Sequence, residues 1–352
     1  MSSPWAGERL RTLRHLFGLS QGQLAQAAGV GQSRISQIEN GVLEASNDIL
    51  DAIAASTGSP RSFFEVMPPD VPLGTLRFRK YASARKTEFK RVKALFDEAY
   101  RISNQLLVDA GYGGPDIPML KGEVSDREIE ELAMQVREAL QIGGTSPIRH
   151  LTRACERAGI AVVPLTLPGD EDEAHVVDHF GISYWPAFDE PAVIGYFTGG
   201  PGDRQRFTLA HELGHLVLHS RRRNAADPEN EAHRFAGALL VPHERAIEMF
   251  SKPVTLRQLA QMKANWGISI QALIMRGSHL GLIDEHRKTS LFRQLSARGW
   301  RKSEPVAVRP EEPILIRKLL WSQHGPHVPD TKIGEIVGLQ AMVLRSFAPM
   351  AA

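Results

Sequence analysis

The sequence lacks most features of secreted and membrane proteins. Cys155 is the only cysteine among 352 residues, which excludes an intramolecular disulfide and a zinc site built from several cysteines. No uninterrupted apolar run approaches the ~18 residues that a membrane span needs. Glu8 and Arg9 stand where a signal peptide would need its apolar segment. The sequence therefore predicts a reduced, cytoplasmic protein that has no membrane partner.

A large excess of charge is also missing. The formal net charge is +2, and 42% hydrophobic with 23% charged residues is ordinary for a globular protein, which excludes wholesale disorder. The charge is uneven, because residues 77–93 hold eight basic residues against one acid, Glu88. We interpret this stretch as a solvated helix face or linker, with contact to a DNA backbone as the alternative. The length predicts two or three domains.

Helical and strand patterns follow one another along the chain. Short helices broken by glycines fill the first ~70 residues, and longer helices are predicted over 88–110 and 126–140. A further helix is expected to begin at Ser146-Pro147 and to end at Gly159. Three β-rich runs come next, before a mostly helical remainder: 160–165, 180–185 and 193–198. This order predicts a mostly helical α+β fold.

Two short helices near the N-terminus, Ser20–Ala28 and Gly31–Asn40, have helix-turn-helix proportions. In that motif the second helix lies in the major groove, where glutamine pairs with adenine and arginine with guanine. The predicted outward residues of the second helix are Gln32, Ser33, Arg34, Ser36 and Gln37. Gln21 begins the preceding helix and is predicted to face a phosphate. The alternative is a small helical bundle whose polar face is merely solvated.

The string LSQGQLAQAAGVGQSRISQIENG, Leu19 to Gly41, resembles the XRE family of phage-repressor-like DNA-binding domains. The resemblance covers about residues 7–65 and implies that double-stranded DNA is a partner. Gly31 departs from the capping serine usual in the family, although glycine also caps acceptably. Residues 1–70 carry 5 basic against 7 acidic residues. A single copy of this segment would therefore be attracted only weakly to the phosphates of DNA. A homodimer, or the basic residues 77–93, would have to add phosphate contacts.

The segment RQRFTLAHELGHLVLH, Arg204 to His219, contains an H-E-x-x-H motif. His211 and His215 lie four residues apart, so on a helix both imidazoles can bind one metal ion. Glu212 lies beside them and can accept a proton from water without being a ligand. The flanking residues are mostly apolar, so we predict that this helix is buried. Burying two histidines and a glutamate without a polar partner would cost free energy, which favours a bound metal. Histidines satisfied within the core are the alternative.

A catalytic zinc site with two histidines needs one more protein ligand. Asp227-Pro228 predicts a helix start, after which Glu229 and His233 share one stripe. Glu229 is our choice of third ligand. Glu231 lies roughly 160° away around the helix, so we expect it to be solvated. Glu231 and His233 stay open as alternative ligands.

HELGHLVLH followed by ENEAHRFAGALLVP resembles the ImmA/IrrE family of zinc metallopeptidases. The resemblance implies His211, His215 and Glu229 as metal ligands and Glu212 as general base. His233 stands where the family usually has asparagine, so the surroundings of the metal are expected to differ. Tyr184, His219 and His233 are the candidates for a further donor to the reaction's oxyanion.

The two resemblances together predict the domain order. The expected parts are a helix-turn-helix domain at 1–70, a basic linker and helices at 71–127, a zincin-like metallopeptidase domain at 128–305, and a C-terminal extension without assigned role at 306–352. They imply a transcriptional regulator that uses Zn²⁺, with Mn²⁺ also tolerated, to cleave a repressor or antitoxin-like protein in a stress, prophage or toxin–antitoxin response. The alternative is a repressor that does not cleave, in which the metal domain acts as a sensor or interaction module.

Overall fold

The computed structural model describes residues 3–72, 86–166, 181–222 and 225–349. The chain forms two compact units. The first comprises Met1–Tyr112, Val163–Ile182 and Ile314–Ala352, and the second comprises Gly113–Val162 and Ser183–Pro313. Residues 77–85 of the basic segment 77–93 lie outside the described residues. Among the described helices, none is long and apolar enough to cross a membrane.

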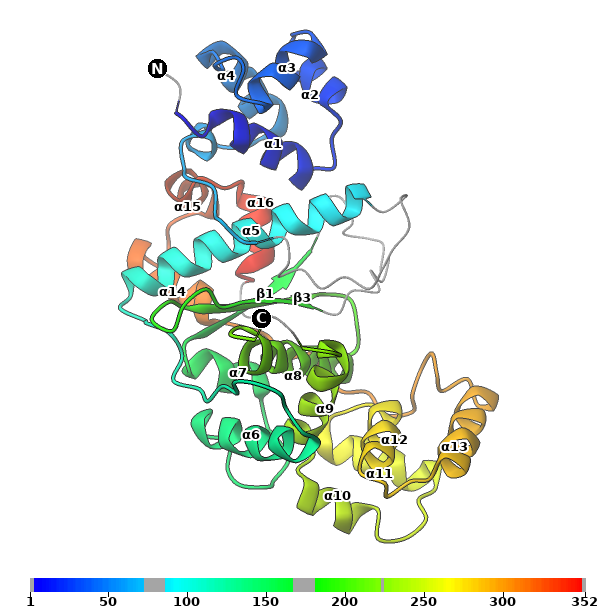
Figure 1. Ribbon diagram of the computed structural model, residues 1–352. Helices are drawn as coiled ribbons and strands as arrows, with labels where there is room; N and C mark the ends of the chain where they lie inside the picture. The colour runs from blue at the N-terminus through cyan, green and yellow to red at the C-terminus, as the bar shows by residue number, and fades with distance from the viewer. Residues whose placement is uncertain (1–2, 73–85, 167–180, 223–224, 350–352) are drawn as a thin grey trace. The chain divides into compact units, whose positions relative to one another are not determined.

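The first unit begins with the short helices predicted from the glycine breaks and a 3-10 helix that was not predicted (Figure 1). They are α1 (Ala6–Leu16), α2 (Gln21–Ala27), α3 (Gln32–Glu39), α4 (Asn47–Thr57) and the 3-10 helix η1 (Arg61–Phe64). Ser20 and Gln23 form a capping box at the start of α2, where the sequence predicted a helix to begin. Leu24, Ile35 and Ile38 are buried, so α2 and α3 pack through their apolar sides and leave polar sides outward.

The first unit also contains the long helix α5 (Lys86–Asp109) and the C-terminal helices. The latter are α14 (Leu315–His324), α15 (Asp330–Val337) and α16 (Ala341–Phe347). Hydrogen bonds join these helices to the start of the chain, because the Ser62 hydroxyl donates to the carbonyl of Glu335 over 2.6 Å and Gln340 Nε2 donates to the carbonyl of Thr57 over 2.9 Å. The C-terminal residues 314–352 are thus part of the unit that carries the short N-terminal helices.

The second unit begins with α6 (Asp126–Ala139) and α7 (Leu151–Arg157). The expected helix start at Ser146-Pro147 is wrong, because α7 begins only at Leu151. The His150 side chain accepts from the backbone N–H of Arg153 over 3.2 Å and caps the helix there. The three predicted strands form one sheet in the order β1-β3-β2: β1 (Ile160–Leu165), β2 (Gly181–Tyr184) and β3 (Ala192–Phe197).

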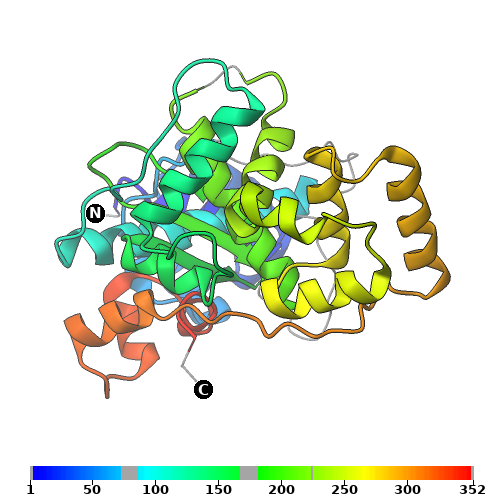
Figure 2. The same ribbon diagram turned by 90° about the horizontal axis from the view of Figure 1, so that it is seen from below.

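The rest of the second unit is helical, as predicted. It consists of α8 (Gly202–His219), α9 (Pro228–Leu240), α10 (His243–Met249), α11 (Leu256–Trp266), α12 (Ile270–His279) and α13 (Glu285–Ala297). The last three pack together, coloured yellow to orange in both views (Figures 1 and 2). The whole chain is therefore a mostly helical α+β fold with one small sheet in its described part.

Helix α8 is buried along nearly its whole length. Its first turns are held by the extended segment after α13, because Arg206 and Glu311 form a buried ion pair of 2.6 Å and Gln205 exchanges two hydrogen bonds of 2.6 Å with the backbone of Glu311. A Cβ at Gly202 would lie 2.2 Å from the carbonyl oxygen of Arg309, so only glycine permits this approach. The helix is thus held at one end by polar contacts and along its length by the core.

Candidate metal centre and DNA-binding face

Helix α8 places the two motif histidines on one face. His211 Nε2 and His215 Nε2 lie 3.1 Å apart, one helical turn from each other. Both side chains are almost buried, with exposed fractions of 8% and 10%. Two imidazole lone pairs this close repel unless a proton or a cation lies between them. The pair is therefore chemically suited to binding a positive ion.

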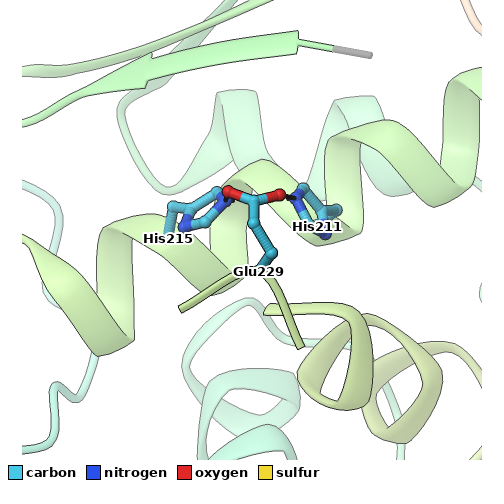
Figure 3. A group of neighbouring side chains, drawn as sticks. All are labelled: His211, His215 and Glu229. Atoms are coloured by element: carbon cyan, nitrogen blue, oxygen red, sulfur yellow. Dashed lines mark hydrogen bonds and ion pairs between the residues drawn. The ribbon is translucent and has the colours of Figure 1, made fainter. Parts of the chain in front are cut away.

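Helix α9 brings a carboxylate to the same point. Asp227 caps the helix, accepting from the N–H of Asn230 over 3.2 Å, and Glu229 follows in the first turn. The oxygens Oε1 and Oε2 of Glu229 lie 3.4 Å from Nε2 of His215 and of His211 respectively (Figure 3). Burial raises the pKa of Glu229, but hydrogen bonds from the two histidines outweigh it and hold that pKa far below its usual range.

The close packing of α8 and α9 depends on Gly214. A Cβ at this position would lie 3.0 Å from Cδ1 of Phe235 and 3.3 Å from the Cα of Ala232. Glycine inside the motif therefore lets α9 approach α8 closely enough for Glu229 to meet both histidines.

The three side chains fit a divalent metal. One donor atom from each of His211, His215 and Glu229 lies within 4.8 Å of the others. Ligands held ~2.0–2.1 Å from a tetrahedral zinc are ~3.3 Å apart, which matches the separations of 3.1 and 3.4 Å here. Two imidazoles and one carboxylate are a ligand set typical of catalytic zinc, and the cluster is thus able to hold such an ion.

Glu212 points toward the sheet. Its Oε2 accepts a hydrogen bond of 2.7 Å from the hydroxyl of Ser183 on β2, and the residue is 5% exposed. Sequence reasoning missed Ser183. The sequence offered one signal, a polar residue inside an apolar strand shortly before the motif. This signal is weak, because polar and apolar residues commonly alternate along a strand.

The surroundings of His215 correct one expectation. Glu231 was expected to be solvated, but its side chain is only 15% exposed and bonds to two others. Its Oε2 lies 2.9 Å from His219 Nε2, and its Oε1 accepts from Arg222 over 2.6 Å. Burial raises the pKa of Glu231, but these hydrogen bonds outweigh it and hold the pKa below its usual value. His219 and Arg222 follow the motif at the end of α8, and they turn the Glu231 carboxylate away from solvent.

His233 lies beside His211. Its ring centroid is 4.6 Å from that of His211 and 5.5 Å from that of Phe207. Among the described residues, the cluster of side chains that could bind one metal ion consists of His211, His215 and Glu229. It includes neither Glu231 nor His233. Of the three candidate oxyanion donors, His219 is bonded to Glu231 and to His215, and Tyr184 and His233 stay candidates.

The predicted DNA-contacting residues of α3 lie on its outer side. Gln32, Ser33, Arg34 and Gln37 are exposed and Ser36 is half-buried. Gln21, at the start of α2, is half-buried and its Nε2 donates to Glu39 over 2.9 Å. Glu39 also pairs with Arg14, whose Nε lies 2.6 Å from Oε1. The amide nitrogen of Gln21 is therefore engaged within the domain and joins α2 to α3.

Comparisons with known proteins give two family matches. Residues 10–64 match the family model described as Helix-turn-helix, and residues 155–278 match the peptidase M78 model described as IrrE N-terminal-like domain. The search of curated proteins returned no match. Among solved structures, the crystal structure of Bacillus thuringiensis PlcR in complex with the peptide PapR7 and DNA is 14% identical over 86% of this chain and 99% of that one. Its TM-score of 0.17 is too low for any structural argument.

Proposed function

We propose that this chain, which joins a helix-turn-helix domain to an IrrE N-terminal-like domain of the M78 peptidase type, is a DNA-binding regulator with a zinc-dependent endopeptidase. The observation that carries the proposal is the meeting of His211, His215 and Glu229, with Glu212 next to the first histidine. Two imidazoles and a carboxylate leave coordination positions for water and substrate. This distinguishes a catalytic site from a closed structural one.

In the proposed reaction His211, His215 and Glu229 hold the metal. A bound zinc ion acts as a Lewis acid, which polarises a peptide carbonyl and makes water a better nucleophile. Manganese also tolerates this ligand set, so either metal is compatible with the site. Glu229 would bind the metal as a carboxylate and the two histidines as neutral imidazoles.

Glu212 is the proposed general base. It takes a proton from the attacking water and later delivers it to the nitrogen of the leaving amine. The hydroxyl of Ser183, which donates to Oε2 of Glu212 over 2.7 Å, orients the carboxylate for these transfers. Burial among apolar neighbours strengthens the interactions of the carboxylate with the reacting atoms.

DNA binding is assigned to the first unit. We propose that the outer side of α3 reads bases through Gln32, Ser33, Arg34, Ser36 and Gln37, and that Gln21 faces the DNA backbone through its backbone N–H at the start of α2. Since the first 70 residues have more acids than bases, a homodimer is proposed to supply the missing phosphate contacts. A protein that works on chromosomal DNA in this way would act in the cytoplasm.

The proposed substrate is another regulatory protein, a repressor or an antitoxin-like chain. DNA binding would bring the peptidase to a substrate held at the same operator, which raises its local concentration. Cleavage would then control the expression of stress, prophage or toxin–antitoxin genes. Proteins encoded beside the gene are the substrates to test first.

The test compares the wild type with Glu212→Gln, and Glu244→Gln is the matched control because Glu244 is exposed on α10. Each protein is loaded with zinc, its metal content is measured, and it is incubated with the purified products of neighbouring genes. We expect one zinc per chain in all three and a specific cleavage product from the wild type and the control only. Undiminished cleavage by Glu212→Gln would remove Glu212 from the mechanism. Zinc binding and operator repression without any cleavage would favour a repressor that uses the metal domain as a sensor.

A further inference from the structure

A chain of hydrogen bonds leads away from the proposed metal ligand His215. His215 Nδ1 lies 2.9 Å from His219 Nδ1, and His219 Nε2 lies 2.9 Å from Glu231 Oε2. The other oxygen of Glu231 accepts from Arg222 over 2.6 Å. The chain runs from α8 to α9 and back to the residues that follow α8, so it joins two consecutive helices and the segment between them.

The direction of each hydrogen bond follows from the chemistry at its two ends. Arg222 can only donate, so Glu231 accepts at Oε1, and as a carboxylate it also accepts at Oε2. His219 therefore donates through Nε2, and as a neutral imidazole it has Nδ1 as an acceptor for His215. When the metal is bound, His215 in turn carries its proton on Nδ1, and the lone pair of its Nε2 faces the point between Glu229 and His211.

We infer that Arg222, Glu231 and His219 are positioning residues, which hold His215 in the one tautomer and ring orientation that can bind the metal. This inference rests on the proposed metal site. A ligating histidine commonly donates its other N–H to a neighbouring acceptor, which makes the ring a stronger ligand. Here the acceptor is a second histidine, and a carboxylate–arginine pair polarises it.

Burial makes the arrangement selective. The side chains of His219, Glu231 and Arg222 are 2%, 15% and 11% exposed, so water competes little for their hydrogen bonds. The charges of Glu231 and Arg222 cancel, and this lowers the cost of placing a carboxylate there. His211 contrasts with His215, because its buried Nδ1 has no hydrogen-bond partner among the described residues. The two ligands are thus oriented by different means.

The first test measures zinc affinity in the full-length chain by competition with a chromophoric chelator. The variants are His219→Phe, His219→Asn and Glu231→Gln, and Glu244→Gln is the control. Losing a partner of this kind typically lowers metal affinity about 10–100-fold, and we expect that range for His219→Phe and its lower end for Glu231→Gln. Asparagine places an oxygen where Nδ1 of histidine lies, so His219→Asn should recover much of the affinity.

The second test reads the tautomers directly. Long-range ¹H–¹⁵N spectra of the zinc-loaded wild type should show His215 protonated on Nδ1 and His219 protonated on Nε2. In Glu231→Gln the His219 signals should move strongly, whereas a merely structural role of Glu231 would leave them in place. Thermal unfolding of the metal-free variants checks that each one folds.

The outcomes separate this inference from the proposed function. Wild-type affinity in His219→Phe, or the opposite tautomer at His219, would overturn the inference and leave the peptidase proposal intact. If Glu231→Gln weakens zinc binding while His219→Phe does not, Glu231 is itself a ligand and the positioning role is wrong. A wild type that binds zinc without cleaving any protein would contradict the peptidase and leave the inference standing. A wild type that binds no zinc would overturn both.

Discussion

Helices α3 and α8 both carry polar side chains to which a function is assigned, but they hold them in opposite surroundings. On α3 the inward positions Ile35 and Ile38 are buried and the polar residues face solvent. On α8 nearly every residue is buried, including His211 and Glu212. A solvated polar group needs no partner within the protein, whereas a buried one is costly unless it is bonded. We therefore expect changes on α3 to affect binding alone, and changes around α8 to affect both binding and stability.

The largest effect is expected from Glu229→Ala, which removes one of three ligands. The zinc affinity should fall at least about 100-fold, since ~10–16 kcal/mol of binding free energy at a structural zinc is shared among few ligands. Chelator competition measures it, with Glu244→Ala as the control. An unchanged affinity would show that Glu229 does not hold the metal, and that the buried histidines of α8 have another purpose.

The next effect concerns the pH dependence of the second unit. Burial raises the pKa of Glu311, but hydrogen bonds and the Arg206 charge outweigh it and lower the pKa from 4.5 to about 2. A lowered folded-state pKa stabilises the fold above pH 4.5 and loses that contribution as the pH falls toward 2. The contribution is about 3 kcal/mol at neutral pH, because a tenfold change in proton affinity corresponds to ~1.4 kcal/mol.

Urea unfolding of the metal-free protein at several pH values tests this expectation. The free energy of unfolding of the wild type should fall between pH 4.5 and 2. Glu311→Gln should be less stable at neutral pH and should lose less on acidification than the wild type. Parallel pH profiles for the two proteins would mean that Glu311 does not anchor the first turns of α8.

On α3 the sharpest test is Arg34→Ala. Arg34 is exposed, so the free energy of unfolding should change by less than about 0.5 kcal/mol. Affinity for an operator selected from random duplexes should fall by roughly 1–3 kcal/mol if the guanidinium reads a base. Arg127→Ala is the matched control, because its side chain is 87% exposed in the second unit and loses the same charge. Equal losses in both variants would point to net charge rather than base contact.

The smallest effect is expected from Gly214→Ala. Alanine favours a helix over glycine by about 1 kcal/mol, but here its Cβ would lie 3.0 Å from Cδ1 of Phe235, and overpacking costs roughly 1–3 kcal/mol. We expect a net loss of about 1 kcal/mol in unfolding free energy, with weaker zinc binding because α9 carries Glu229. Gly22→Ala on α2 is the control, since its Cβ would meet no atom closer than 3.7 Å. Tighter zinc binding in Gly214→Ala would contradict this account of the helix contact.

Local signals explain which parts of the fold were predictable. The capping box at Ser20 and Gln23 and the cap at Asp227 are short-range patterns, and the structure contains both. The start of α7 was placed wrongly, because the cap at His150 is supplemented by Glu311, a residue 159 positions from Thr152, which accepts from the N–H of Thr152 over 2.7 Å. No local pattern contains such a partner. The expected solvation of Glu231 was wrong for the same reason.

The sequence by itself determined the periodic elements, the exposed side of α3 and the pairing of His211 with His215, because helical geometry alone relates residues four apart. Only the tertiary structure decided what lies around that pair. The approach of α9 across Gly214, the bond from Ser183 to Glu212 and the chain through His219 all join separate elements. Such contacts depend on how buried surfaces pack, and packing is a property of the whole core that spacing along one helix does not contain.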